Sequence, residues 1–286
     1  MVADFHLHTN ASDGEMDPSA LVERAAAHGV TRLSITDHDT LAAYRREGGV
    51  VFQLARRLGV ELAVGIELDV ALDGREVHLL GLGLDADAPA LSAHLAAVRA
   101  ARLERARRDL ALVNERLGFG TLRPEQVFAP GRDALMRAHF IRPLMDEGRF
   151  ASYGEGREWF HANADGDVRV PKPSMAEAIG MIHGAGGVAV LAHPAYYWKD
   201  GFPILDSLPR LRALGLDGVE LEYPYCSSSP ELFSQADAEW FTGALRAAGE
   251  ALSLRFTRGS DAHGPGDFDR VYGPVAPEAP KGEGEA

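Results

Sequence analysis

The histidines and acids of this chain gather in short clusters that follow apolar runs. In the first cluster, MVADFHLHTNASDG, His6 and His8 are one residue apart and Asp13 lies in the loop that follows. Because a strand has a side-chain period of two, histidines at this spacing point to the same side of a strand. The pattern predicts two imidazoles and a carboxylate near one strand end, and these groups bind divalent metal ions.

Five later segments carry the same residue types at the ends of apolar runs or inside them. The segments SITDHD, VGIE, EVHLL, VAVLAHP and GSDAH supply His38, Glu67, His78, His193, Asp261 and His263. A single histidine near a strand end is ordinarily structural, but the joint placement of all these groups predicts a shared site. The six imidazoles and three carboxylates are too many for one tetrahedral ion, so we expect two or three ions with a carboxylate bridging a pair. Such ligands suit Mn²⁺, Zn²⁺ or Fe²⁺.

Seven apolar segments read as the strands that must position these groups. They cover residues 1–8, 31–39, 60–70, 76–84, 187–194, 217–223 and 253–264. Helical patterns separate most of them, which predicts an α/β fold with a largely parallel sheet and, at this length, a seven-stranded barrel. In such folds the chemistry collects at the carboxyl ends of the strands.

The strand pattern stops in the middle of the chain. Residues 86–160 read as helical and arginine-rich, so we expect a helical insertion there and a discontinuous barrel built from residues 1–85 and 161–275. The tail, residues 276–286, is rich in Pro, Gly and Glu and is predicted to be disordered.

The overall composition excludes several classes of protein. The net charge of −13 argues against a protein that coats nucleic acid, so no stable DNA binding is expected. No apolar run is long enough to span a membrane, and the start does not read as a signal peptide, so a cytoplasmic location is expected. Cys226 is the one cysteine, which rules out a disulfide framework and a thiolate metal cage.

The insertion carries a local excess of positive charge. Between Arg99 and Arg149 there are 11 arginines and seven acidic residues, a local net charge of +4. Candidate phosphate-binding residues are Arg102, Arg105 and Arg108, which share a helix face, and Lys172 in VPKP. The alternative is a solvated helix face on which these arginines pair with neighbouring acids.

These motifs resemble those of the PHP (polymerase and histidinol phosphatase) family. FHLHTNASDG, SITDHD, VGIELD, VLAHP and GSDAH are similar to its motifs and stand in its order. EVHLLGLGL, MRAHFIRPLMDEG and AGGVAVLAHP are most similar to the branch of 3′,5′-nucleoside bisphosphate phosphatases, some of which are 5′–3′ exonucleases on short RNA. The resemblance implies a distorted seven-stranded (β/α)7 barrel of the PHP type with a trinuclear metal site.

The resemblance also implies how the ligands are shared among the ions, with Mn²⁺ the first choice of metal. One ion would be held by His6, His8, Glu67 and Asp261. A second would be held by Glu67, His78 and His193, with Glu67 as the bridge, and a third by Asp13, His38 and His263. Glu67, Asp261 and His193 are the expected catalytic residues.

Other residues receive roles from the same resemblance. Asp13 stands where some members carry histidine. Asp37 and Asp39 flank His38 and are expected to orient imidazoles, although a simple turn pair is an equal reading. Arg137 and His139 match a motif of the branch that lies near the substrate.

The leading hypothesis is a metal-dependent phosphoesterase that removes the 3′-phosphate of nucleoside 3′,5′-bisphosphates by metal-activated water, with short RNA as a further substrate. One alternative is a histidinol-phosphate phosphatase, which would use the same metal centre. The other is a non-catalytic scaffold domain. The presence of all nine expected ligands argues against this alternative. The expected partner is a small phosphorylated nucleotide, not a membrane, and the oligomeric state is left open.

Overall fold

Seven strands form one sheet in the computed structural model, which describes residues 2–118, 120–164 and 168–274. Their spatial order follows the sequence: β1 (Val2–Asp4), β2 (Val30–Ile35), β3 (Glu61–Leu72), β4 (Arg75–Leu82), β5 (Val188–Leu191), β6 (Gly218–Glu222) and β7 (Arg255–Arg258). Each strand overlaps one of the seven predicted segments, so the prediction of a seven-stranded α/β fold is confirmed.

The sheet is mixed in direction. The pairs β1–β2, β2–β3, β5–β6 and β6–β7 are parallel, whereas β3–β4 and β4–β5 are antiparallel. Strands β3 and β4 form a hairpin around Asp73 and Gly74, which have φ angles of 49° and 79°. A two-residue turn with both φ angles positive matches the twist of a hairpin. No helix separates β3 from β4, so the regular (β/α)7 alternation is interrupted here.

The two ends of the sheet approach each other beyond β1 and β7. The backbone N–H of Phe5 donates to the carbonyl of Arg258 (3.0 Å), that of Asp261 to His6 (2.9 Å), and that of His8 to Ala262 (3.0 Å). No ladder joins β1 to β7 themselves in the described ranges, so full barrel closure stays a prediction. These three bonds place the first and the last motif of the chain side by side.

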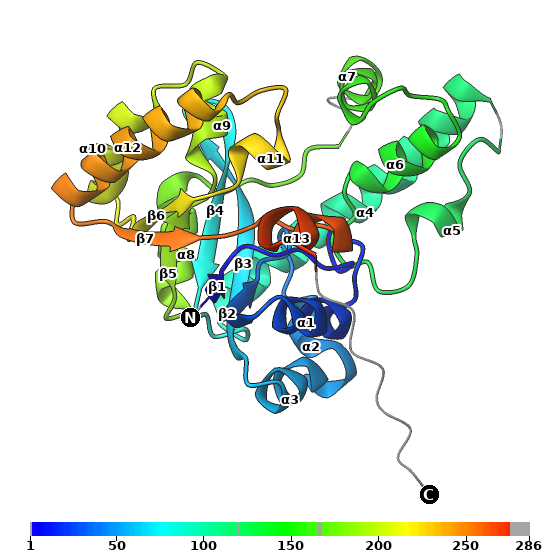
Figure 1. Ribbon diagram of the computed structural model, residues 1–286. Coiled ribbons are helices and arrows are strands. Elements are labelled where there is room, and N and C mark those ends of the chain that lie inside the picture. Colours follow the sequence, from blue (N-terminus) through cyan, green and yellow to red (C-terminus); the bar gives the residue numbers. More distant parts are fainter. Residues whose placement is uncertain (1, 119, 165–167, 275–286) are drawn as a thin grey trace, which may run out of the picture.

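Helices surround the sheet, as Figure 1 shows. They are α1 (Pro18–Ala27), α2 (Ala42–Arg45), the 3₁₀ turn η1 (Arg46–Gly48), α3 (Val50–Arg57), α8 (Met175–Gly184), α9 (Pro194–Lys199), α10 (Ile204–Ala213), α11 (Tyr225–Ser228), α12 (Gln235–Ala251) and α13 (Pro265–Tyr272). Helix α1 begins where the Asp17 side chain accepts from the Ser19 and Ala20 N–H groups, and α8 begins with a Ser174–Glu177 capping box. In the part of the chain that the structure describes, no helix is both long and apolar enough to cross a bilayer.

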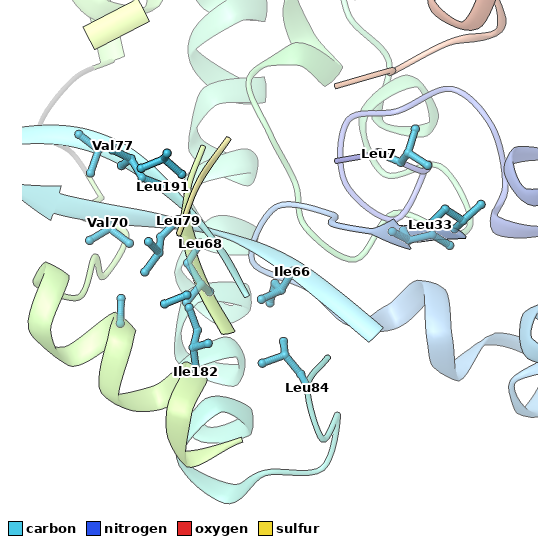
Figure 2. Packing of buried hydrophobic residues seen from close by; sticks show 14 of the residues in the cluster. Leu7, Leu33, Ile66, Leu68, Val70, Val77, Leu79, Leu84, Ile182 and Leu191 are labelled. Carbon is cyan, nitrogen blue, oxygen red and sulfur yellow. The ribbon is translucent and has the colours of Figure 1, made fainter. Parts of the chain in front are cut away.

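The main core extends around the sheet, and one part of it lies between the β3–β4 hairpin and α8. Ile66, Leu68 and Val70 of β3 are fully buried, and Figure 2 shows Ile66 facing Ile182 of α8 and Leu84. Truncation of such a side chain to alanine costs about 2–5 kcal/mol. Glu67 also lies on β3, so this packing fixes the backbone that positions Glu67.

The helices of the middle segment lie to one side of the sheet (Figure 1). They are α4 (Pro89–Leu117), α5 (Pro124–Val127), α6 (Ala138–Asp146) and α7 (Tyr153–Ala164). They share an apolar cluster of their own, which includes Val113, Phe140, Ile141, Leu144 and Phe160. Helix α7 runs past residue 160, the predicted end of the insertion, and the domain division stays a prediction. The predicted tail, 276–286, lies outside the described residues.

Candidate metal centre and adjoining cleft

The first histidine pair lies just beyond β1, not inside a strand as expected. Strand β1 ends at Asp4, and the following residues are held by the backbone bonds to the chain after β7. Both side chains still point the same way, because the Nε2 atoms of His6 and His8 lie 3.3 and 2.9 Å from Oδ1 of Asp261. The prediction from their spacing is therefore confirmed in direction and wrong in its strand boundary.

Glu67 lies at the centre of the cluster, and its side chain is 1% exposed. Its Oε2 atom is within 3.3 Å of the Nε2 atoms of three imidazoles, those of His6, His8 and His38. Its Oε1 atom is 3.0 Å from Nδ1 of His78 and 3.2 Å from Nε2 of His193. A carboxylate with different imidazoles at each oxygen has the geometry of a bridge between two ions.

The structure brings all nine predicted ligands together. Donor atoms of eight of them form three overlapping groups, each within 4.8 Å: His6, His8, Glu67 and Asp261; His38, Glu67 and His78; and His8, Asp13, His38 and His263. The first group is the predicted one. The second group contains His38 where His193 was predicted, and Nε2 of His193 lies 3.2 Å from Nδ1 of His78. The third group contains His8 in addition to the three predicted residues. We call these nine residues the metal cage.

Unpaired buried atoms show that the metal cage fits cations. The side-chain atoms of the metal cage with no hydrogen bond in the described ranges include His6 Nε2, both ring nitrogens of His8 and Asp13 Oδ1. Buried polar atoms are nearly always paired in folded proteins. Several lone pairs that converge without donors therefore indicate a site built for positive charge.

The electrostatic environment of the metal cage also favours cations. Burial alone would lower the pKa of His6, but the carboxylates of Glu67, Glu220 and Asp261 hold it well above its ordinary value. Burial would likewise lower the pKa of His8, but Asp261 and Glu67 outweigh that effect and raise the pKa to about 10. An environment that stabilises the protonated imidazoles this strongly also stabilises bound cations, which take the place of those protons.

Residues behind the ligands fix their orientation, and the sequence did not single these out. Glu220 of β6 is fully buried, lies 3.1 Å from Nδ1 of His6, and accepts from the backbone N–H of His193 (2.8 Å). The Tyr223 hydroxyl donates to Oδ2 of Asp261 (2.8 Å). Such partners set which imidazole nitrogen faces a metal ion. The available signal was Glu220 itself, a carboxylate inside the apolar run DGVELEY.

Strained backbone also marks the rim of the metal cage. Asp39, His193 and Asp261 have φ angles of 51°, 29° and 54°. Non-glycine residues in this region cost free energy and persist where the surrounding structure holds them, typically at functional sites. Gly259 of the GSDAH motif has a different constraint: a Cβ atom there would lie 2.3 Å from both His6 Cβ and Glu220 Oε1.

Gly259→Ala is therefore expected to displace His6 and lower kcat by about 100-fold, the loss that a misplacement of about 1 Å causes. The matched control is Gly266→Ala, where an added Cβ meets nothing within 4 Å. Steady-state kinetics of both variants with added Mn²⁺ checks this. Equal kcat values for the two variants would show that His6 tolerates the added methyl group.

A cleft of about 1300 Å³ opens beside the metal cage. Its basic lining residues are Arg102, Arg105, Arg137, Arg157, Arg169 and Lys172, and its acidic ones are Asp69, Glu76 and Glu158. Asp69 connects the cleft to the cage, because its Oδ1 atom is 3.3 Å from His38 Nδ1. Four predicted substrate residues (Arg102, Arg105, Arg137 and Lys172) line this cleft, and sequence reasoning missed Arg157 and Arg169.

The other two predicted substrate residues lie elsewhere. Arg108 is exposed and donates to Glu104 (2.9 Å), as expected for a solvated helix face. His139 is buried, donates from Nε2 to the carbonyl of Ser12 (2.8 Å) and accepts at Nδ1 from the Met136 N–H. Burial lowers the pKa of His139 to about 4, so the ring is neutral at pH 7. In this position it supports the loop that carries Asp13.

The chain shares its sequence and fold with proteins of one family. Residues 4–123 match the PHP domain. The 3′,5′-nucleoside bisphosphate phosphatase of Chromobacterium violaceum is 32% identical over 94% of this chain and 90% of that protein. The 5′–3′ exoribonuclease Rnm of Escherichia coli is 33% identical over 93% of this chain and 86% of its own.

A solved structure agrees with these relatives. A crystal structure titled as a metal-dependent phosphoesterase of Bifidobacterium adolescentis superposes with a TM-score of 0.74 and 27% identity, over 93% of this chain and 89% of that one. The relatives, the PHP match and the convergence of the nine predicted ligands agree. The chain belongs to the PHP family of metal-dependent phosphoesterases.

Proposed function

We propose that the protein removes the 3′-phosphate from nucleoside 3′,5′-bisphosphates. The observation that carries this proposal is the position of the cleft, which is lined by arginines and meets the metal cage at Asp69. A substrate with two phosphates fits this arrangement, with one phosphate at the cage and the other among the arginines. The name of the Chromobacterium relative supports the same substrate class.

The metal cage would supply the reactive part of the site. Two or three divalent ions, when bound, provide a water of lowered pKa and offset charge on the phosphoryl oxygens. Glu67 would bridge ions through its two oxygens, while Asp261 and His193 hold the cage from the chain after β7 and β5. Glu220 keeps His6 and the His193 backbone in place, and Tyr223 does the same for Asp261.

Arg105 is the best candidate for binding the second phosphate. It makes no hydrogen bond or ion pair with any residue that the structure describes. Burial and the neighbouring charges of Arg102 and Arg137 lower the pKa of Arg105 to about 10. A phosphate dianion at this point would compensate these charges, and guanidinium groups suit it geometrically.

Trimming of short RNA from the 5′ end is a second candidate, favoured by the size of the cleft. About 1300 Å³ exceeds the roughly 300–1000 Å³ of ordinary small-ligand pockets. Arg157 and Arg169 also line it and would lie along further phosphates of an oligonucleotide. The name of the Escherichia relative agrees with this activity.

A comparison of kcat/KM with added Mn²⁺ tests these proposals. The substrates are adenosine 3′,5′-bisphosphate, a 5′-phosphorylated short RNA and histidinol phosphate. We expect the bisphosphate to be preferred over histidinol phosphate. A preference for histidinol phosphate would overturn the proposal, and no turnover of any of them would favour a non-catalytic scaffold.

Arg105→Ala is expected to raise KM for the bisphosphate by about 10- to 100-fold with a small change in kcat, because a hydrogen bond to a charged group contributes about 1.5–3 kcal/mol. The same substitution should hardly change KM for adenosine 3′-monophosphate, which lacks the second phosphate. Arg107→Ala, at an exposed position of the same helix, is the control. Equal effects of Arg105→Ala on both substrates would remove the assignment.

A further inference from the structure

We propose that Arg102 of α4 is a positioning residue for the metal cage and not a substrate ligand. It acts through Asp69, which contacts the imidazoles of His38 and His78. This inference concerns metal retention and is independent of which phosphoester the protein cleaves.

The guanidinium of Arg102 forms ion pairs with two carboxylates. Its side chain is 2% exposed, and its Nη2 atom donates to Oδ2 of Asp39 and to Oδ2 of Asp69, the latter at 2.8 Å. Asp39 is also tied to Asp69, because its Oδ1 accepts from the Asp69 backbone N–H (3.2 Å). Two buried carboxylates this close need a cation between them, and removing it leaves uncompensated charge.

Asp69, held in place by Arg102, lies beside two of the predicted ligands, His38 and His78. Its Oδ1 atom is 3.3 Å from Nδ1 of His38 and 3.7 Å from Nε2 of His78. The opposite nitrogens of both rings face Glu67, at 3.3 Å for His38 Nε2 and 3.0 Å for His78 Nδ1. Each imidazole therefore offers one nitrogen to the cage and the other to Asp69. A carboxylate in that place sets the tautomer and ring orientation of a metal-binding histidine.

The same arrangement accounts for the remaining acid–histidine group, Asp69, Glu76 and His78. Lys172 forms an ion pair with Glu76, and Arg102 with Asp69, so positive charge is already supplied on this side. The group is best explained as the support behind His78 and not as a further ion site.

Arg102 also joins two parts of the chain that are far apart in sequence. It lies on α4 of the middle segment, whereas Asp39 follows β2 and Asp69 is on β3. In addition to the buried apolar residues Leu91 and Leu95, this guanidinium therefore links α4 to the sheet and to the support of the metal cage. We expect the middle segment to influence metal affinity as well as substrate binding.

Mn²⁺ titration of the full-length Arg102→Met variant tests this inference. Methionine keeps the apolar contacts of the side chain and removes the charge, and circular dichroism reports whether the fold is retained. We expect Mn²⁺ to bind at least about tenfold more weakly, or in lower stoichiometry, as for loss of other groups behind metal ligands. Arg107→Met, the same change at an exposed position of α4, should bind Mn²⁺ like the unaltered protein.

A folded Arg102→Met variant with unchanged Mn²⁺ affinity and stoichiometry would overturn the proposal, even if its melting temperature fell. Arg102→Lys keeps the charge but replaces the guanidinium fork by a single ammonium, so it decides the question if the methionine variant does not fold. We expect several-fold weaker Mn²⁺ binding for Arg102→Lys. Affinity equal to that of the unaltered protein would overturn the positioning role.

Discussion

Glu67→Gln is expected to lower kcat by at least about 1000-fold, a loss of about 4 kcal/mol of transition-state stabilisation, without changing the fold. Glutamine has the shape of glutamate but only one oxygen, so it cannot bridge two cations. Its amide nitrogen would also face imidazole nitrogens that now lie 3.0–3.3 Å from a carboxylate oxygen. Steady-state kinetics with Mn²⁺, together with circular dichroism, measures the effect.

The matched control for this variant is Glu61→Gln. Glu61 lies on the same strand, but its side chain is 66% exposed and pairs with Arg32. Exposed pairs of this kind contribute little to stability, so the control should keep full activity. Retention of more than about one-tenth of kcat by Glu67→Gln would remove the bridging role, because a loss of less than about 1.4 kcal/mol is too small for the removal of a bridging ligand.

Removal of metal ions by a chelator is expected to abolish activity and to lower the melting temperature by about 10 °C. A ligand present at about 1000 times its Kd stabilises the folded state by about 4 kcal/mol, and a chain of this size shifts by about 2–4 °C per kcal/mol. The protein should remain folded, because His6 and His8, whose pKa values are raised, take up protons and partly replace the lost cations. Thermal unfolding before and after chelation measures the shift.

Readdition of Mn²⁺ is the control for chelation and should restore both activity and melting temperature. Full activity in a sample that elemental analysis shows to be metal-free would contradict the metal-dependent account. An unchanged melting temperature would indicate that the metal cage is held by packing alone.

The sequence predicted that these histidines and acids would lie together because their spacing carries that information. The interval between His6 and His8 is one strand period, and Asp261 and His263 repeat it at the other end of the chain. The structure places these two segments side by side through backbone hydrogen bonds. The approximate positions of the strands were likewise readable from apolar runs bounded by turns, as at Asp73 and Gly74.

Other features depend on contacts that no local pattern reports. Arg102 and Arg108 occur on one arginine-rich helix, yet one is buried between Asp39 and Asp69 while the other is exposed and pairs with Glu104. Which arginine faces the sheet depends on how α4 docks. The antiparallel pairing of β4 with β5 depends in the same way on tertiary packing. His78 consequently reaches the metal cage from the middle of an antiparallel strand.

Glu220 and Gly259 show how far the motif residues depend on one another. Glu220 contacts His6, and Gly259 lies against both, with no room for a Cβ atom. The glycine of the GSDAH motif can be noticed in the sequence, but the need for glycine there becomes apparent only when the segments of His6, Glu220 and Gly259 meet in the fold. The metal cage therefore depends on residues that never touch a metal ion.

The central claim is that nine side chains from distant segments together hold several divalent ions. The most direct measurement is anomalous X-ray scattering at the manganese edge from crystals grown with Mn²⁺. The account predicts two or three strong peaks, one of them between His6, His8, Glu67 and Asp261. A crystal that contains Mn²⁺ but shows no peak within coordination distance of Glu67 would contradict it.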